Sequence, residues 1–245
     1  MPTTPPEAPA IAIPDVPSGL GVKGRWIPRT FTIVPWMALF LLSPTLVPQL
    51  RPLSALTWSG ELLINSLCIL LLAWLLPIYL KRDGLSVRDL GFEARPLKRD
   101  ILQGFAAGAG IKALSFVLFS FLIRGPEVNL QMHIYSSDGI EVVSKIIFVV
   151  ILAPVMEELL FRAGLIVPLG ACWGRGARRD AVYVLISAVL FGCIHSLGDP
   201  IYYIGYILIG AAFACVYVKT ASLRTVMIAH VLFNASGLTL GALLR

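Results

Sequence analysis

Residues 142–170 read VVSKIIFVVILAPVMEELLFRAGLIVPLG, an apolar run interrupted near its middle by two glutamates and an arginine. A helix needs about 20 mainly apolar residues to cross the hydrocarbon of a bilayer, so this run is long enough to span a membrane. The run is continuous and does not alternate between apolar and polar positions, which favours a helix over a barrel strand. The stretch therefore predicts an all-α membrane protein with charge inside the bilayer.

The composition of the whole chain supports this prediction. Of the 245 residues, 57% are hydrophobic and only 14% are charged, about half the charged share of a soluble domain. So few charges could not cover the apolar surface of a soluble chain of this size, so part of the solvent must be lipid. The net charge of +6 comes from Lys and Arg in short loops beside apolar runs. That placement is typical of membrane topology signals and gives no reason to expect a nucleic-acid partner.

Six further apolar runs are also candidate spans, although the fifth and sixth spans of the chain are short for crossing a bilayer. The seven predicted spans cover residues 31–50, 62–80, 101–123, 142–170, 181–197, 201–218 and 223–244. Gly104 and Gly108 in the third span are four residues apart, a spacing that allows close contact between helices. We expect residues 1–30, which begin with a stretch rich in Pro, Ala and Thr, to form a disordered cytoplasmic tail. Residues 31–245 are expected to form one transmembrane helical domain.

Lys and Arg are unevenly divided between the two sides of such a bundle. If seven spans alternate, four positive clusters lie on the side of the N-terminus, which the positive-inside rule assigns to the cytoplasm. The opposite side carries only Arg51, Arg124, Lys145 and Arg245. We therefore expect an integral membrane protein with a cytoplasmic N-terminus, and the Pro-rich tail and small size favour the inner membrane of a bacterium. The four clusters are Lys23, Arg25 and Arg29; Lys81, Arg82, Arg88, Arg95, Lys98 and Arg99; Arg175, Arg178 and Arg179; and Lys219 and Arg224.

The charged residues of the fourth span are candidate site residues, because a charge inside lipid costs at least about 2 kcal/mol unless it is paired. Glu158 and Arg162 are four residues apart and share one helix face, with the acid first, which predicts an ion pair. Glu157 is rotated by about 100° from that face and has no local partner, which makes it a candidate proton acceptor. The alternative is that all three form one structural network.

Two later spans carry histidines. His195 ends the fifth span and shares a face with Phe191, and His230 shares a face with Asn234 in the seventh. His230 and Asn234 can both donate hydrogen bonds to one point, which suits an oxyanion, although His and Asn also join membrane helices in purely structural contacts. Counted from the cytoplasmic ends of their spans, Glu157, His195 and His230 lie within about 10 Å of one another in depth.

These residues together resemble a known family. Glu157-Glu158-x-x-x-Arg162, Phe191-x-x-x-His195 and His230-x-x-x-Asn234 are similar in order and spacing to the motifs of the CPBP family, the type II CAAX prenyl endopeptidase or ABI family. The resemblance covers a protease-like core at about residues 142–244. The segment Asp89-Leu90-Gly91-Phe92 also resembles a linker that is common in the family.

The resemblance implies an intramembrane endopeptidase of the glutamate type, a peptide hydrolase. By residue match, Glu157 and His195 activate a water, while His230 and Asn234 line an oxyanion hole. Glu158 and Arg162 would hold the site together, and Phe191 would pack beside it. The implied substrates are membrane-embedded, membrane-associated or lipidated proteins or peptides, and no cofactor is expected.

Three alternatives remain on sequence grounds. A zinc-dependent intramembrane protease could use Glu157, His195 and His230 as ligands, but the chain lacks His-Glu-x-x-His and Asn234 would have no role. A non-catalytic membrane protein for self-immunity against bacteriocins or other peptides would also fit the family resemblance. A transporter is disfavoured, because the sequence shows neither a repeat nor paired broken helices.

Overall fold

The computed structural model describes residues 87–92, 95–123, 139–195 and 200–243, with single positions at 66, 70, 74, 77, 78 and 81. These residues form helices and no strand, so the predicted all-α class is confirmed for them. Residues 1–30 and the span at 31–50 lie outside the described residues, as does nearly all of 62–80. The count of seven spans therefore stays a prediction.

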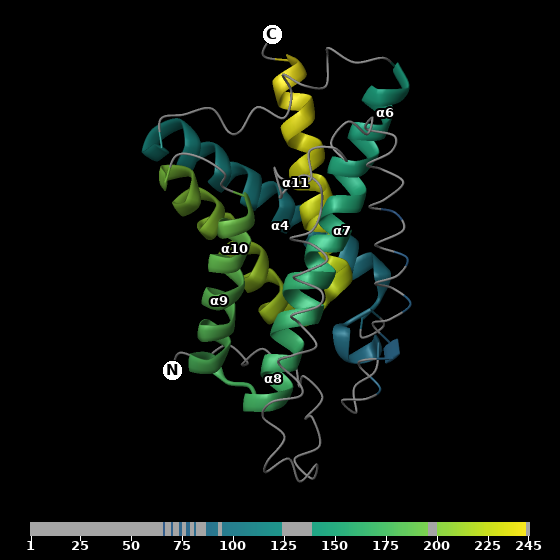
Figure 1. Cartoon of the computed structure of the whole chain (residues 1–245), viewed down its shortest axis with the longest axis vertical. Coiled ribbons are helices and arrows are strands. Elements are labelled where there is room, and N and C mark those ends of the chain that lie inside the picture. Colours follow the sequence, from purple (N-terminus) through teal and green to yellow (C-terminus); the bar gives the residue numbers. More distant parts are fainter. Residues whose placement is uncertain are drawn as a thin grey trace, which may run out of the picture.

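The described helices correspond to the last five predicted spans (Figure 1). A short 3₁₀ helix, η2 (Val87–Leu90), precedes α4 (Leu97–Val117), which continues into the π-helical η3 (Leu118–Ile123). The fourth span is one long rod that alternates between α and π geometry, and three separate helices follow it. The rod consists of α6 (Gly139–Ile147), η4 (Phe148–Leu152), α7 (Ala153–Glu158), η5 (Leu159–Ile166) and α8 (Val167–Trp173). The three helices are α9 (Ala177–His195), α10 (Pro200–Thr220) and α11 (Leu223–Leu243).

The outer surface of this bundle is apolar. Two of the described helical stretches, Leu97–Phe121 and Tyr202–Thr220, are long and apolar enough to cross a membrane. Phe105, Phe116 and Leu185 are each more than half exposed, whereas Glu158 and Arg162 are fully buried. Large exposed apolar surfaces are unusual on soluble monomers, and a charged interior beneath an apolar exterior indicates that lipid surrounds the bundle.

Helices α4 and α11 are in close contact, as the two glycines in the third span predict. A Cβ atom added to Gly104 would lie 2.7 Å from the side chain of Ile228, and one added to Gly108 would lie 2.6 Å from the Ala229 carbonyl oxygen. Only glycine leaves room for α11 to approach α4 this closely. The contact fixes the part of α11 that carries His230.

A buried polar cluster joins the start of α4 to the start of α11. Asp100 is fully buried and accepts hydrogen bonds from the hydroxyls of Ser222 and Thr225, both at 2.9 Å. Arg224 forms an ion pair with the other Asp100 oxygen at 2.7 Å. The Ser222 hydroxyl also accepts a hydrogen bond from the Thr225 backbone N–H at 3.2 Å, which caps the first turn of α11. The cluster therefore holds the two helix ends in register.

The segment Asp89–Phe92 packs beneath the turn between α10 and α11. Leu90 is fully buried, and Gly91 has φ +83° with its Cα so close to Ala221 that an added Cβ would overlap the carbonyl oxygen. Arg95 donates a hydrogen bond to the Thr220 carbonyl oxygen at 3.1 Å. Arg224 also donates a hydrogen bond to the Arg95 carbonyl oxygen, so parts of two of the four predicted cytoplasmic clusters lie at one end of the bundle. Which face of the membrane this end occupies stays a prediction.

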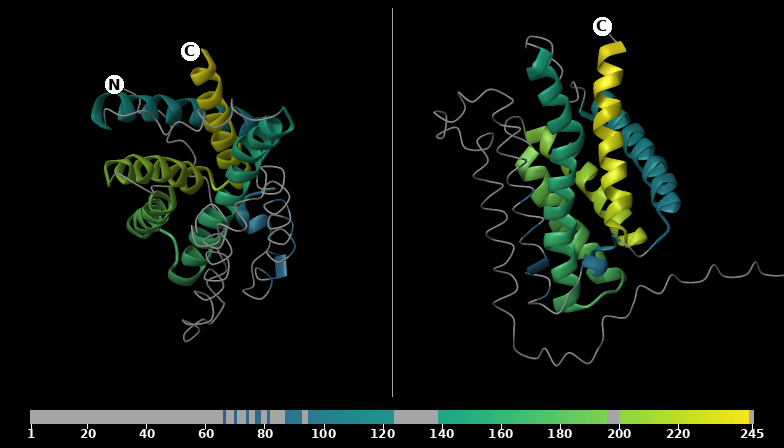
Figure 2. Two further views of the ribbon diagram at one scale, coloured as in Figure 1. Left: turned by 45° about the horizontal axis from the view of Figure 1, so that its top comes forward. Right: turned by 90° about the vertical axis from the view of Figure 1, so that its right-hand side faces the viewer.

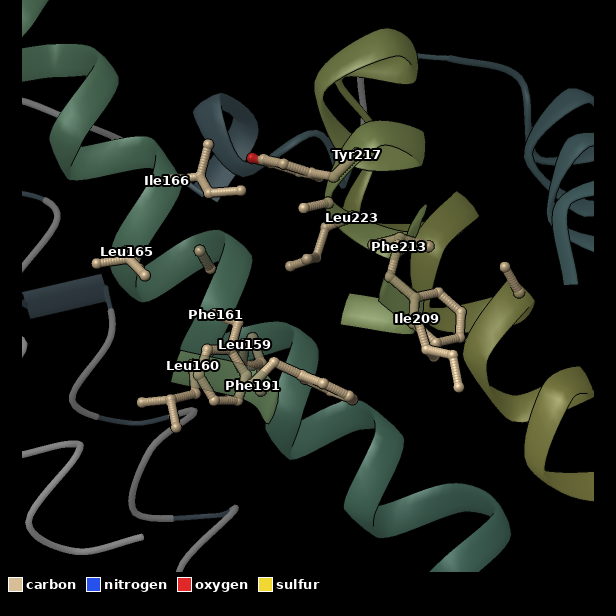
Figure 3. Packing of buried hydrophobic residues seen from close by; sticks show 14 of the residues in the cluster. Leu159, Leu160, Phe161, Leu165, Ile166, Phe191, Ile209, Phe213, Tyr217 and Leu223 are labelled. Carbon is tan, nitrogen blue, oxygen red and sulfur yellow. The ribbon is translucent and has the colours of Figure 1, made fainter. Parts of the chain in front are cut away.

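The core packs where the rod meets α9 and α10. Phe161 from the rod and Phe191 from α9 lie edge to face with ring centroids 5.5 Å apart. Figure 3 shows this pair beside Leu160, with Phe213 and Ile209 of α10 on the other side of the core. The rod and α11 run alongside each other through the bundle (Figure 2). The candidate site residues lie between these elements.

Candidate active site

Glu158 connects three helices of the bundle. One of its carboxylate oxygens pairs with Arg162 Nε at 2.9 Å, and the other accepts a hydrogen bond from His230 Nδ1 at 2.8 Å. Arg162 also donates to the Gly210 carbonyl oxygen of α10 at 3.2 Å. The structure thus contains the ion pair expected between Glu158 and Arg162 and extends it to α10 and α11. Such a connected network offsets part of the cost of burying these charges.

Aromatic rings enclose the Arg162 guanidinium. Its central carbon lies 5.6 Å from the ring centroid of Phe191 and 5.9 Å from those of Phe161 and Phe213. Ring faces attract a cation more strongly where water is excluded. Phe191, predicted as a supporting residue, therefore packs against both Arg162 and the histidine on its own helix.

Glu157 lies between two imidazoles. Its Oε2 is 3.6 Å from His195 Nε2 and 3.7 Å from His230 Nε2. The glutamate is buried, and this oxygen has no hydrogen-bond partner within the part of the chain that the structure describes. The sequence leaves Glu157 without a partner on its own helix, and the structure supplies two histidines from α9 and α11. The two gaps are longer than a direct hydrogen bond but suit groups that exchange protons through a small bound molecule.

The other nitrogen of each imidazole fixes the ring. His195 Nδ1 lies 2.8 Å from the Phe191 carbonyl oxygen, and His230 Nδ1 lies 2.8 Å from the Glu158 carboxylate. Both partners accept hydrogen bonds, so each Nδ1 carries a proton and donates it. In the neutral form of each ring, Nε2 carries no proton and faces Glu157 Oε2. Nε2 is therefore the ring atom through which a proton can enter or leave.

Stacked aromatic rings hold both imidazoles in place. His195 stacks on Phe191 with centroids 4.1 Å apart and on Tyr206 at 5.2 Å. His230 stacks on Phe213 at 4.3 Å. Tyr206 and Phe213 were not predicted as site residues, although their spacing of seven positions on one apolar span is a signal that they share a helix face.

Lys112, the one charge of the third predicted span, is also buried near the site. Its ammonium lies 4.9 Å above the Phe233 ring, which packs against Phe213 with centroids 5.6 Å apart. A lysine in this position is accommodated by the ring face and by its long apolar stem. Helix α4 therefore lines one side of the polar interior.

Asn234 lies one turn beyond His230 on α11. Its side-chain Nδ2 donates a hydrogen bond to the Val149 carbonyl oxygen at 2.8 Å, across the gap to η4. The side-chain amide has two N–H groups, so this bond leaves one donor free for another acceptor. The convergence of Asn234 and His230 on one oxyanion stays a prediction.

The described residues do not assemble a metal site. Among them, no group of three or more His, Cys, Asp or Glu side chains is arranged to hold a metal ion. The expectation that the protein needs no cofactor stays a prediction, for which an experiment is given below.

The fold and this centre define a helical membrane protein in which a buried glutamate lies between a buried histidine, His230, and a partly exposed one, His195. Residues 139–236 match a family model described as type II CAAX prenyl endopeptidase, Rce1-like. The matched segment contains all seven predicted site residues and excludes α4. No curated protein and no solved structure matches the chain.

Proposed function

We propose that the protein is an intramembrane endopeptidase of the glutamate type that hydrolyses peptide bonds in membrane-associated or lipidated proteins or peptides. The observation that supports this most directly is Glu157, whose buried Oε2 faces Nε2 of both His195 and His230 at 3.6 and 3.7 Å. Three polar atoms that converge in this way can bind one water beside them and exchange protons with it.

In the proposed reaction, Glu157 and His195 act on a water beside the scissile carbonyl. Glu157 accepts a proton from the water. At the same time the water oxygen bonds to the carbonyl carbon, and the π electrons of the carbonyl move to the carbonyl oxygen. The tetrahedral intermediate then collapses, the C–N bond breaks, and the proton passes through the Glu157–His195 pair to the leaving amine. Water is consumed, and the products are a carboxylate and an amine. No serine or cysteine nucleophile is needed.

His230 and Asn234 are proposed to stabilise the oxyanion. Asn234 retains one amide N–H after bonding Val149. His230 Nδ1 donates its proton to Glu158, so the ring can also donate from Nε2 only when both nitrogens are protonated. Glu158 then lies beside the positive charge of the ring. Fixed donors of this kind in a water-poor site contribute strongly to the stabilisation of an oxyanion.

Protein termini in the membrane fraction test the proposal. Membranes from the native organism are compared with those from a Glu157→Ala strain, and N- and C-termini are mapped by mass spectrometry. Termini that form only when Glu157 is present would identify the substrates and cleavage sites. Identical termini, with the variant protein present at its normal level, would refute the protease and favour a non-catalytic protective role.

Cleavage is expected to persist when metal ions are removed, because the proposed reaction activates its water with a carboxylate and an imidazole and not by binding it to a metal ion. The measurement is turnover of a mapped substrate by purified enzyme before and after treatment with EDTA and 1,10-phenanthroline. A zinc protease treated in the same detergent serves as the positive control for chelation. Loss of activity that added Zn²⁺ restores would instead support the zinc-dependent alternative.

A further inference from the structure

The helix that carries Glu157 changes geometry just before the site. Residues Phe148–Leu152 form the π-helical segment η4, and the Ala153 backbone N–H bonds to the Phe148 carbonyl oxygen, five residues back. Pro154 follows at the start of α7 and is buried. Single π-helical turns inside α-helices occur frequently at functional sites, and here one immediately precedes the paired glutamates.

Pro154 leaves one carbonyl of this turn without a main-chain donor. In α geometry the Val149 carbonyl oxygen would accept from Ala153, but that N–H is bonded to Phe148. In the π geometry that the preceding bond sets, the donor would be residue 154, and a proline has no N–H. A partly buried carbonyl without a donor is costly, so it requires a partner from outside the helix.

Asn234 provides that partner. Its Nδ2 lies 2.8 Å from the Val149 carbonyl oxygen, and α11 packs beside η4 and α7. One N–H of the amide is thereby fixed in direction, and because the amide group is planar, the second N–H is fixed with it. The unusual backbone of one helix therefore determines the orientation of a side chain on another.

We infer that Pro154 is a positioning residue for Asn234. Because Pro154 has no N–H, the Val149 carbonyl has no main-chain donor and accepts a hydrogen bond from Asn234 instead. That bond orients the amide that is proposed to face the oxyanion. The inference rests on the proposed function, because it assigns Asn234 a role in the reaction. If its role were purely structural, the same hydrogen bond would only hold α11 against the rod. The two readings differ in what a proline replacement does to turnover and to stability.

The test is Pro154→Ala, which supplies the missing N–H at the point where the π turn directs it toward Val149. Helix interiors favour alanine over proline, so the unfolding temperature in detergent should be unchanged or higher. Once the carbonyl has a main-chain donor, Asn234 loses its anchor. We expect kcat to fall by about tenfold to a hundredfold with KM unchanged, somewhat less than the ~10²–10³-fold cost of deleting an oxyanion donor.

Pro168→Ala is the matched control. Pro168 follows the second π-helical segment of the rod, η5, in the same way, since the Val167 N–H bonds to the Arg162 carbonyl oxygen and the proline comes next. It lies beyond the site residues of the rod, so its replacement should leave kcat and KM at their wild-type values. Asn234→Ala, alone and combined with Pro154→Ala, completes a double-mutant cycle.

The outcomes separate the inference from the proposed function. The substrate is a fluorogenic peptide spanning a cleavage site found by terminus mapping, and a wild-type enzyme that does not cleave it contradicts the proposed function itself. Where the wild type cleaves, the inference requires that Pro154→Ala add little to the loss already caused by Asn234→Ala. It is overturned if Pro154→Ala keeps full kcat, if its effect is independent of Asn234, or if turnover falls only because the protein melts at a lower temperature.

Discussion

Replacing Glu157 with glutamine is expected to abolish cleavage while leaving the protein folded. The amide keeps the size and shape of the side chain but cannot take a proton from water. General acid–base groups contribute about 10²–10⁴-fold to turnover, and because Glu157 faces both His195 and His230, we expect a loss toward the upper end of this range. Oε2 has no hydrogen-bond partner among the described residues, so the substitution breaks no hydrogen bond of that atom.

The measurement is kcat on a peptide spanning a mapped cleavage site, together with the unfolding temperature in the same detergent. Asp180→Asn is the matched carboxylate-to-amide control, because Asp180 pairs with Arg175 near the end of the bundle and not with the buried histidines. It should keep wild-type turnover. Normal turnover by Glu157→Gln would contradict the assignment of Glu157 as the base, whereas an unfolded variant would show that Glu157 is structural.

Replacing Arg162 with alanine is expected to unfold or strongly destabilise the bundle. Arg162 and Glu158 are fully buried, and the substitution leaves the Glu158 carboxylate with His230 as its one remaining partner among the described residues. Removing one member of a buried pair costs about 3–5 kcal/mol, because the other charge remains in a medium of low dielectric constant. The Gly210 carbonyl oxygen loses its donor as well, and the three surrounding rings lose a packed side chain.

Folded yield and unfolding temperature in detergent measure this effect. Arg178→Ala, a change at an exposed arginine of the same positively charged end, should be neutral. The double variant Glu158→Gln/Arg162→Met removes both charges. Because no unpaired carboxylate remains, it should regain part of the lost stability, but it should not regain activity. A fully stable Arg162→Ala protein would show that this ion pair does not hold the site together.

The apolar runs predicted most of the described fold. Five predicted spans correspond to α4 with η3, the rod, α9, α10 and α11, and their ends agree within a few residues because the length of an apolar run fixes where a helix can stay in lipid. The close contact at Gly104 and Gly108 was also predicted, since small residues four apart are a local signal. The alternation of α and π turns in the rod was not predicted, because it depends on which backbone groups find partners across the bundle.

The site was predicted as a set of residues but not as a set of contacts. The motif spacing identified Glu157, Glu158, His195 and His230, and the structure brings them together. Spacing along one helix contains no information about partners on another, so the bond from His230 to Glu158 could not be derived. The same holds for Asp100, whose polar partners lie more than 120 residues away in the sequence.

The three helices that supply the centre are made at different times. Glu157 and His195 belong to α7 and α9, whereas His230 belongs to α11, which the ribosome delivers last of the three. Docking of α11 also requires Ser222 and Thr225 to find Asp100 on a helix that was inserted much earlier. Until then Glu158 lacks its histidine, and Glu157 faces one imidazole rather than two. In the proposed mechanism the centre is therefore incomplete until α11 has docked, and a chain that is still being inserted lacks the residues proposed to stabilise the oxyanion.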